Sequence, residues 1–230
     1  MNQIETIQKL CALPGVTGFE QSAAQTIAEM LRPLVNKVDV DPFGTVTGIL
    51  VSPRPHAKTV LLDAHLDQIG FLVTEVLEGG FLRFAPIGGV DPRMLLGCEV
   101  TILAASPLYG VISCTPPHLM QAGDADHAVP IHEMMIDTGL LDAAAVIPVG
   151  TPIIFRHPPI QLSKNVVAGK CLDDRAGVLA ILQTLSQLDR KKLMVHVAVM
   201  FSAQEEVTSL GAMTGAFRLR PDYAIAIDVS

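Results

Sequence analysis

The 230-residue sequence is poor in several kinds of residue, and each shortage excludes a class of protein. It has no tryptophan, only 4% aromatic residues and only 17% charged residues. Disordered chains are rich in charge and poor in apolar residues, so the 50% apolar content excludes that class. Lys and Arg number 16 against 23 Asp and Glu, which gives a net charge of −7. This balance argues against a nucleic-acid or anionic-membrane surface, because such surfaces need clustered positive charge.

The sequence also lacks a segment with the form of a membrane span or a signal peptide. Its longest stretch without a formal charge, residues 100–123, is interrupted by three prolines, whereas a spanning helix needs about 20 mainly apolar residues. The first ten residues lack the basic and apolar parts of a signal peptide. The cysteines, Cys11, Cys98, Cys114 and Cys171, show no CxxC spacing. We therefore expect free thiols and a cytoplasmic protein that has no membrane or nucleic-acid partner.

Residue patterns divide the chain into an α/β region and an all-β insertion. The periodicity of apolar residues predicts helices at 2–12, 20–31, 174–188 and 210–217, and strands at 38–40, 45–51, 59–64, 193–201 and 223–229. Between about residues 71 and 155 only short strands and turns are found, which suggests a small sandwich or barrel. We predict an α/β domain from residues 1–70 and 158–230, interrupted by a β domain at residues 71–157.

Several polar residues stand where predicted strands end or where a helix begins. They are His65, Asp67, Asp173, Asp174, Glu205, Glu206 and Asp228. In open α/β sheets, ligand sites gather outside the carboxyl ends of the strands. One imidazole and several carboxylates, far apart in the sequence, are therefore expected to meet at one edge of the sheet.

Such a cluster has the composition of a metal site. Grouped carboxylates repel one another and raise each other's pKa values, and a divalent cation removes that repulsion. Imidazole together with carboxylates suits zinc, cobalt or manganese and does not choose among them. Two ions about 3.5–4 Å apart, sharing a carboxylate and a water, need this set of ligands. A further carboxylate that binds no metal could then transfer the proton.

Each of these residues also has an ordinary structural interpretation. His65 alone could be a structural histidine, and Asp173 with Asp174 could cap a helix. The pair Glu205 and Glu206 could be a solvated turn. Asp228 is harder to explain in this way, because an aspartate that follows an apolar strand needs a partner if it is buried. Their joint placement at strand ends favours a metal site.

Four motifs resemble those of the M42 metallo-aminopeptidases, the family of the tetrahedral and glutamyl aminopeptidases. In chain order they are DAHLDQIGF (63–71), GKCLDDRAG (169–177), SAQEEVTSLGA (202–212) and AIDVS (226–230). Segments 81–97, 110–119 and 135–139 resemble the inserted β domain of that family. The resemblance implies a zinc-peptidase-like fold, in which an open mixed sheet carries helices on both faces. It also implies that the barrel-like insertion serves oligomerisation.

The resemblance assigns a role to each candidate ligand. His65 and Asp228 would bind one metal ion, Asp173 would bridge two ions, and Glu206 would bind the second. The implied cofactors are two divalent ions, zinc or cobalt, with manganese as a third candidate. These roles follow from the family's motifs and not from spacing alone.

The resemblance also implies the reaction and the partners. Glu205 would be the general base and Asp67 would steady His65, so both act in catalysis. The reaction would be hydrolysis of N-terminal residues from peptides by a hydroxide that bridges the two metals. The partners would be peptide substrates and further copies of the chain, from a dimer to a tetrahedral particle of twelve subunits. A charge fraction of 17% fits buried contacts between subunits.

The sequence departs from the family at two places. Thr208 and Ser209 replace a family pattern that contains glycine and arginine. The family also continues beyond the strand of Asp228 and supplies a final histidine ligand, whereas this sequence stops at Ser230. We therefore expect a fragment, a truncated product or a chain that a partner completes. A protein that ends at Ser230 is predicted to bind the second metal weakly and to have little peptidase activity.

Two other functions and one other site are considered. The protein could be a related dinuclear amide hydrolase such as a deacylase, or a non-catalytic assembly subunit. His118, His127 and His132 surround the acidic residues at 124–126. We interpret that segment as a solvated loop or a subunit contact rather than a second metal site.

Overall fold

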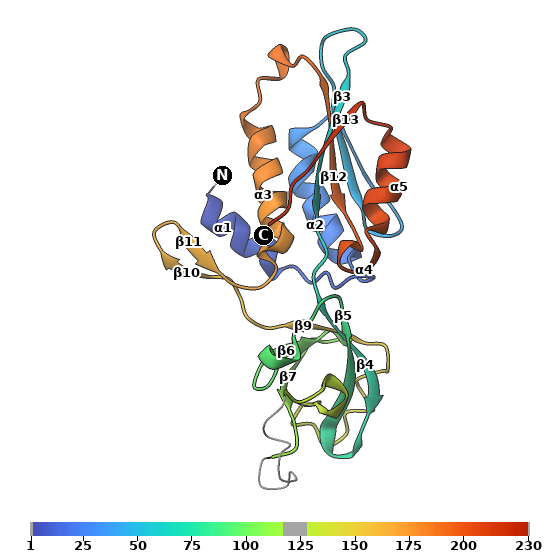
Figure 1. Cartoon of the computed structure of the whole chain (residues 1–230), viewed down its shortest axis with the longest axis vertical. Helices are drawn as coiled ribbons and strands as arrows, with labels where there is room; N and C mark the ends of the chain where they lie inside the picture. The colour runs from blue at the N-terminus through green and yellow to red at the C-terminus, as the bar shows by residue number, and fades with distance from the viewer. Residues whose placement is uncertain (1, 117–127, 230) are drawn as a thin grey trace. The chain divides into compact units, whose positions relative to one another are not determined.

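The computed structural model describes residues 2–116 and 128–229. The chain divides into two compact units, the first formed by Met1–Gln68 with Pro158–Ser230 and the second by Ile69–His157 (Figure 1). His118, His127 and the acidic residues at 124–126 lie outside the described residues, so the structure does not address the interpretation of that loop.

The first unit contains a five-stranded mixed sheet. Its strands are β1 (Lys37–Val40), β2 (Val46–Leu50), β3 (Thr59–His65), β12 (His196–Ser202) and β13 (Tyr223–Ala226). Their order is β1-β2-β12-β3-β13. β3 pairs in parallel with β12 and β13, and β2 pairs antiparallel with β1 and β12. β3 lies inside the sheet, between β12 and β13, which explains why its sequence is apolar toward both faces.

Helices cover both faces of this sheet, as the sequence predicts (Figure 1). They are α1 (Gln3–Ala12), α2 (Gln21–Leu31), α3 (Leu172–Gln187), the short α4 (Glu205–Thr208) and α5 (Leu210–Leu219). One face packs against α1, α2 and α3 through a core that includes Leu10, Ile27 and Ile181. The other face packs Met200 against Ala216 of α5 and its neighbours. Each fully buried aliphatic side chain contributes about 1.5–3 kcal/mol to this packing.

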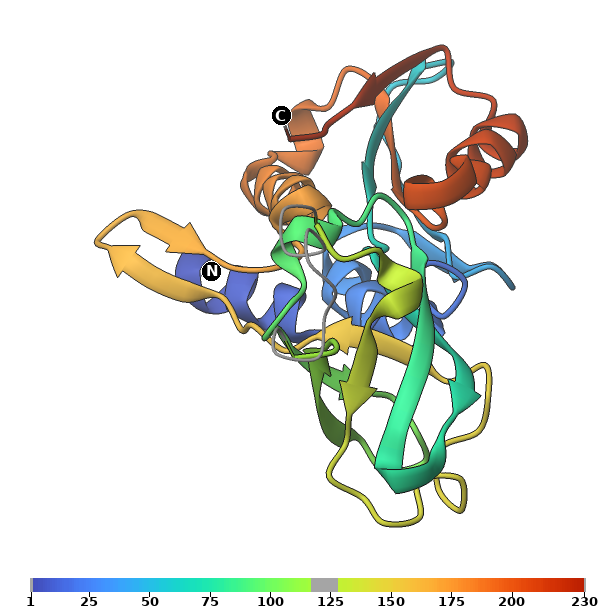
Figure 2. The ribbon, with the colours of Figure 1, turned by 60° about the horizontal axis from the view of Figure 1, so that its bottom comes forward.

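A small hairpin in the first unit is absent from the sequence prediction. It consists of β10 (Ile160–Ser163) and β11 (Val166–Ala168), which form a separate two-stranded sheet. Figure 2 shows the hairpin beside α1, where Gln8 Nε2 donates a hydrogen bond of 3.3 Å to the carbonyl of Pro159. Its strands are only four and three residues long, too short for a pattern of apolar residues to mark them.

The second unit is a closed six-stranded barrel. Its strands are β4 (Gly70–Val76), β5 (Phe81–Ile87), β6 (Glu99–Ile102), β7 (Leu108–Ser113), β8 (Met135–Asp137) and β9 (Pro152–Phe155), in the order β4-β5-β8-β7-β6-β9. The pairing of β4 with β9 closes it, so the expected sandwich or barrel is a barrel (Figure 2). Phe71 and Phe84 meet edge to face in its core, with ring centroids 5.0 Å apart. Gly110 lies against Ile136, and a Cβ at this glycine would have no room.

The sequence predicts that the chain has no membrane-spanning helix and that its cysteines are free thiols. Within residues 2–116 and 128–229, no helix is long and apolar enough to cross a membrane. The four cysteines are free, as expected.

Candidate metal centre

The candidate residues gather at the carboxyl edge of the mixed sheet. His65 is the last residue of β3, and its register partner Ser202 is the last residue of β12. β13 ends at Ala226, beside Asp63, so the next residues of the chain also leave at this edge. The parallel pairing of these strands explains the convergence, because parallel strands end on the same side of a sheet.

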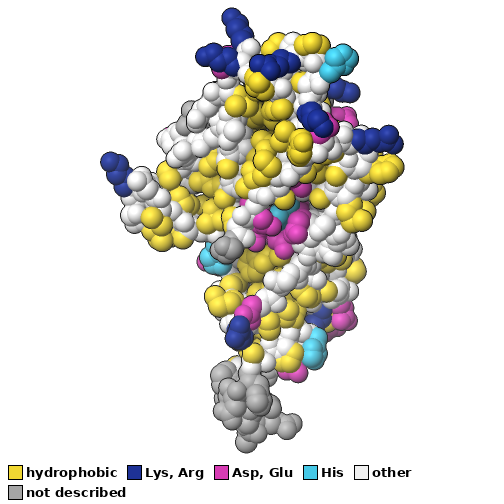
Figure 3. All heavy atoms as spheres, turned by 45° about the horizontal axis from the view of Figure 1, so that its top comes forward, with side chains coloured by type: hydrophobic (Ala, Val, Ile, Leu, Met, Phe, Trp, Pro, Cys, Tyr) yellow, Lys and Arg dark blue, Asp and Glu magenta, His cyan; other side chains and the backbone are white. Residues whose placement is uncertain are grey.

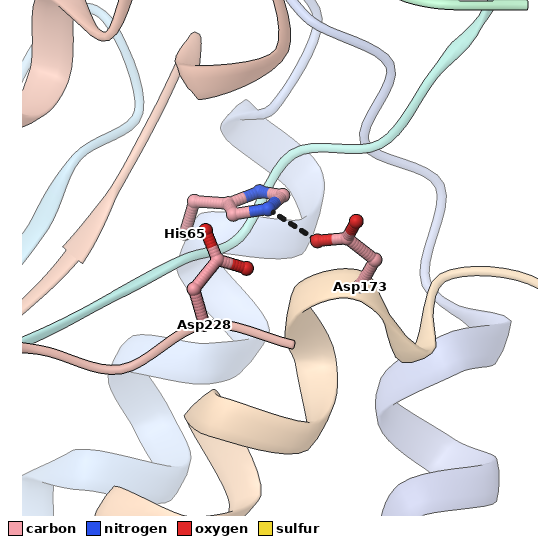
Figure 4. A group of neighbouring side chains, drawn as sticks. All are labelled: His65, Asp173 and Asp228. Carbon is pink, nitrogen blue, oxygen red and sulfur yellow. Dashed lines mark hydrogen bonds and ion pairs between the residues drawn. The ribbon is translucent and has the colours of Figure 1, made fainter. Parts of the chain in front are cut away.

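Three candidate ligands lie together at this edge. His65, Asp173 and Asp228 each offer one ligand atom, and these atoms lie within 4.8 Å of one another. Figure 4 shows the imidazole and the two carboxylates pointing toward a common point from β3, the start of α3 and the segment after β13. His65 Nε2 and Asp173 Oδ1 are 2.8 Å apart. The group therefore has the form of a small metal site with one buried and two exposed members.

The other side of the imidazole faces Asp67. His65 Nδ1 lies 3.4 Å from Asp67 Oδ1, an ion-pair contact between two buried side chains. The Asp67 carboxylate also accepts hydrogen bonds from the backbone N–H groups of Glu205 (3.0 Å) and Glu206 (3.2 Å). The hydroxyl of Thr17 donates a further bond of 2.7 Å. Asp67 therefore ties the histidine to the start of α4.

The two glutamates of α4 lie beside the cluster. The Glu205 carboxylate is 3.9 Å from His65 Nε2, so it can reach the same space as the three ligands. Glu206 does not belong to the group of ligand atoms found within 4.8 Å of one another among the described residues. Burial, together with repulsion from the Asp173, Asp67 and Glu205 carboxylates and against the attraction of His65, raises the pKa of Glu206 to about 7.

The electrostatics of this edge favour a cation. Burial alone would lower the pKa of His65, but its contacts with Asp67 and Asp173 raise it to about 10. Burial, followed by repulsion from Asp228 and Asp173, raises the pKa of Asp174 to about 7. Figure 3 shows acidic side chains gathered around a histidine on one face of the molecule. Since imidazole and carboxylates are ligands of zinc, cobalt and manganese, the residues present fit a divalent metal ion.

Two residues of the site were not found from the sequence. Thr17 holds Asp67, and Glu20 accepts a hydrogen bond from the backbone N–H of Gln204, next to Glu205. Both lie in the loop before α2, and Glu20 was interpreted only as the beginning of that helix. The expectation that ligands follow strand ends cannot identify residues in such a loop. Thr17 and Glu20 meet their partners only because the folded chain brings together segments that are far apart in the sequence.

Comparisons with known proteins agree with this architecture. A sequence model of the family described as M42 glutamyl aminopeptidase matches residues 44–230. SgcX of Escherichia coli strain K12 is 30% identical over 231 residues, an alignment that covers 98% of this chain and 62% of SgcX. The solved structure of the aminopeptidase from the archaeon Desulfurococcus kamchatkensis is 33% identical and superimposes with a TM-score of 0.92. That superposition covers 99% of this chain and 63% of the archaeal one.

A further solved structure is the TET1 peptidase of Pyrococcus horikoshii. It is 32% identical, has a TM-score of 0.88, and matches over 99% of this chain and 68% of its own. The chain thus spans less than two thirds of the length of SgcX and of the Desulfurococcus enzyme. The match to the family covers most of the 230 residues and includes His65, Asp173 and Asp228. The chain belongs to the M42 glutamyl aminopeptidase family.

Proposed function

We propose that the protein is an aminopeptidase that uses two divalent metal ions, zinc or cobalt, with manganese as the third candidate. His65 and Asp228 would hold one ion, Asp173 would contact both, and Glu206 would hold the second. One observation carries the proposal: His65, Asp173 and Asp228 come from three separate segments, and their ligand atoms lie within 4.8 Å of one another. Membership of the M42 family supports the peptidase activity.

The residues around the cluster suit peptide hydrolysis. Bound divalent ions would polarise the scissile carbonyl and lower the pKa of water in the site. Glu205 would accept a proton from the water as its oxygen bonds to the carbonyl carbon, and would then deliver that proton to the amine nitrogen as the C–N bond breaks. Asp67 would keep a proton on Nδ1 of His65, which leaves Nε2 free to act as a ligand. The distance of 3.9 Å between Glu205 Oε2 and His65 Nε2 supports this role, because a base must lie near the ligands to reach a metal-bound water.

Substrate comparison tests this proposal. A chelator removes bound metal from the full-length protein, which is then reloaded with zinc, cobalt or manganese. Each sample is assayed on a panel of aminoacyl-anilides. The matched controls are the same anilides with an acetylated amine. We expect metal-dependent cleavage of the free-amine substrates alone. Cleavage of the acylated substrates alone indicates a deacylase, and cleavage of neither by a protein that holds both ions overturns the proposal.

We also propose that residues 71–157 form contacts between copies of the chain. The barrel exposes the apolar side chains Leu141 (99%), Met94 (73%) and Val149 (64%). Apolar side chains that face water together are typical of protein contact surfaces. The Pyrococcus horikoshii TET1 peptidase is described as assembling into a tetrahedron or an octahedral shell. We propose a homo-oligomer between a dimer and a tetrahedral particle of twelve subunits, in the cytoplasm, where four free thiols stay reduced.

Light scattering tests the contact surface. The native mass of the protein is compared with that of a Leu141→Glu, Met94→Glu double variant, because a charge on each side chain opposes burial of the surface. We expect an oligomer that the double variant reduces to smaller species. A native monomer, or an assembly that the variant leaves unchanged, contradicts this role for the barrel.

A further inference from the structure

Glu20 is a buried carboxylate that the proposed reaction does not use. Its side chain is 1% exposed and lies just before α2, where Gly44 approaches so closely that a Cβ there would be 3.0 Å from the Glu20 Cβ. Glu20 Oε1 accepts a hydrogen bond of 3.1 Å from the N–H of Gln204. Oε2 has no partner within the described part of the chain. Burial raises the pKa of this carboxyl to about 7. Such a group is costly to bury, and its one side-chain hydrogen bond within the described residues joins it to the N–H of Gln204, at the start of α4.

That contact belongs to a turn whose backbone is held by side chains at every step. We call residues 203–206 the 203–206 turn. The N–H of Ala203 donates to Thr45 Oγ1 (3.3 Å), and the N–H of Gln204 donates to Glu20 Oε1 (3.1 Å). The N–H groups of Glu205 and Glu206 donate to Asp67 Oδ1 (3.0 Å) and Asp67 Oδ2 (3.2 Å). Four successive backbone donors are thus fixed by three side chains from three separate segments.

The turn needs this support at Gln204. This residue has a left-handed conformation, with φ 60° and ψ 31°. A residue with a Cβ pays about 1 kcal/mol or more to adopt it, so it is held there only by its surroundings. Gln204 immediately precedes Glu205, and its dihedral angles therefore decide where the Glu205 side chain begins.

The loop that carries Glu20 is itself attached to the edge of the sheet. The N–H of Thr17 donates to the carbonyl of Gln68 (3.3 Å), and the N–H of Gln68 donates to the carbonyl of Gly15 (3.0 Å). The hydroxyl of Thr17 then binds Asp67. One loop therefore reaches the site at two points, through Thr17 to the carboxylate that steadies His65 and through Glu20 to the turn that bears Glu205.

We propose that Glu20 is a positioning residue for Glu205, and that it acts by holding the 203–206 turn through the N–H of Gln204. The inference rests on the proposed function, in which Glu205 moves the proton. Loss of this acceptor leaves His65, Asp173 and Asp228 in place, because they lie outside the turn, and displaces Glu205 together with its neighbour Glu206. The expected result is a lower kcat with little change in KM or in the content of the metal ion that His65 and Asp228 hold.

Two substitutions and one control test it. Glu20→Leu removes the acceptor at similar volume, whereas Glu20→Gln keeps an amide oxygen that can accept from Gln204. The control is Ser52→Ala, which removes a buried hydroxyl that donates to the Leu193 carbonyl (2.7 Å) before β12, at the opposite edge of the sheet. Each variant is assayed for kcat, KM, metal content and Tm. Hydrogen exchange is measured on peptides that cover residues 202–209.

We expect Glu20→Leu to lower kcat by about 10- to 100-fold, the scale of a small misplacement of a catalytic group. KM should stay within about twofold, and Glu20→Gln should restore most of kcat. Exchange at residues 202–209 should quicken in Glu20→Leu and stay near wild type in Glu20→Gln and Ser52→Ala. A Glu20→Leu protein with wild-type kcat, or with unchanged exchange in that segment, overturns the inference.

The exchange readout separates this inference from the proposed function. If the wild-type protein cleaves no substrate while Glu20→Leu still frees the 203–206 turn, the peptidase proposal fails and the link from Glu20 to the turn stands. If the wild-type protein is an active peptidase and the turn is unaffected, the link fails and the peptidase stands.

Discussion

The candidate site has an inner side of buried side chains and an outer side of exposed ones. On the inner side, Glu20, His65 and Asp67 are 1%, 4% and 0% exposed, and Asp67 accepts hydrogen bonds from three donors. On the outer side, the Asp173 and Glu205 side chains are 59% and 38% exposed. The inner side is fixed by the folded chain itself, whereas the outer carboxylates repel one another and gain order from a cation. Changes on the outer side should therefore alter binding and chemistry alone, and changes on the inner side should also alter stability.

The largest effect is expected for the outer ligand Asp173. Asp173→Asn removes a charge from the cluster, so metal affinity should fall by more than about 100-fold, the upper end of what loss of a supporting partner costs. The Tm of the chelator-treated protein should stay within about 2 °C, because the exposed carboxylate loses its contact with His65 but also its repulsion from the neighbouring carboxylates. Zinc titration by calorimetry and thermal melts measure the two quantities.

The matched control for Asp173 is Asp222→Asn. Asp222 accepts a hydrogen bond from the N–H of Thr59 (2.8 Å), at the far end of β3, and lies away from the cluster. Wild-type zinc affinity is expected for this control. Equal affinities of Asp173→Asn and the control would show that Asp173 holds no metal.

Glu205→Gln tests the chemistry of the outer side. The amide cannot accept the proton, so kcat should fall by about 10²- to 10⁴-fold, while metal content and Tm stay at wild-type values. Steady-state kinetics with an aminoacyl-anilide and metal analysis of the same sample provide the measurement. A kcat close to that of the wild type would remove Glu205 from the proposed role.

Asp67→Asn tests the inner side and should change both properties. One of its amide positions can no longer accept, so the N–H of Glu205 or Glu206, or the Thr17 hydroxyl, loses a buried partner at a cost of about 1–3 kcal/mol. Metal affinity should also fall by about 10- to 100-fold, because the imidazole of His65 is less firmly oriented. Unlike Asp173→Asn, this variant should melt several degrees lower after metal removal, about 4 °C per kcal/mol or less at this size. An unchanged Tm would contradict the distinction between the two sides.

The sequence predicts the site residues at strand ends better than the loop residues that support them, for a physical reason. His65, Glu205 and Asp228 follow apolar strands, and the parallel pairing of β3, β12 and β13 brings strand ends together whatever the details of packing. Glu20 meets Gln204 across 184 residues, and that contact depends on how a loop folds over the sheet edge. No local pattern of residues encodes such a contact.

In the fold, too, features that depend on local residue patterns could be predicted, whereas features that depend on contacts between distant residues could not. Helices and strands follow apolar periodicity, so the α/β domain and the inserted β region could be predicted from the residues, whereas the open mixed sheet with helices on both faces was implied by the resemblance to the M42 family. The choice between sandwich and barrel depends on the pairing of Phe71 with Ile153, two residues far apart in the chain. The strands of the β10–β11 hairpin, four and three residues long, are too short for apolar periodicity to mark them.

The smallest effect is expected in the pH dependence of the metal-free protein. The folded state raises the pKa of His65 from 6.5 to about 10, so this contribution to stability is complete below pH 6.5 and is lost as the pH rises toward 10. The pKa values of Asp174 and Glu206 are raised to about 7. The fold thus favours their protonated forms, and their contribution is present near pH 4 and lost as the pH rises through 7. All three contributions have the same sign, so the free energy of unfolding should fall by about 1–3 kcal/mol between pH 6 and pH 9.

Metal should reverse this trend. A cation competes with the proton on His65 and with those on the carboxylates, so it binds more tightly as the pH rises. The difference in Tm between the zinc-saturated and the chelated protein should therefore widen from pH 6 to pH 9, and Asp173→Asn should abolish the widening. Thermal melts across this range measure it. A metal-free protein whose stability is flat or rising over the same interval would mean that the outer carboxylates do not repel one another, and the contrast between the two sides would lose its electrostatic basis.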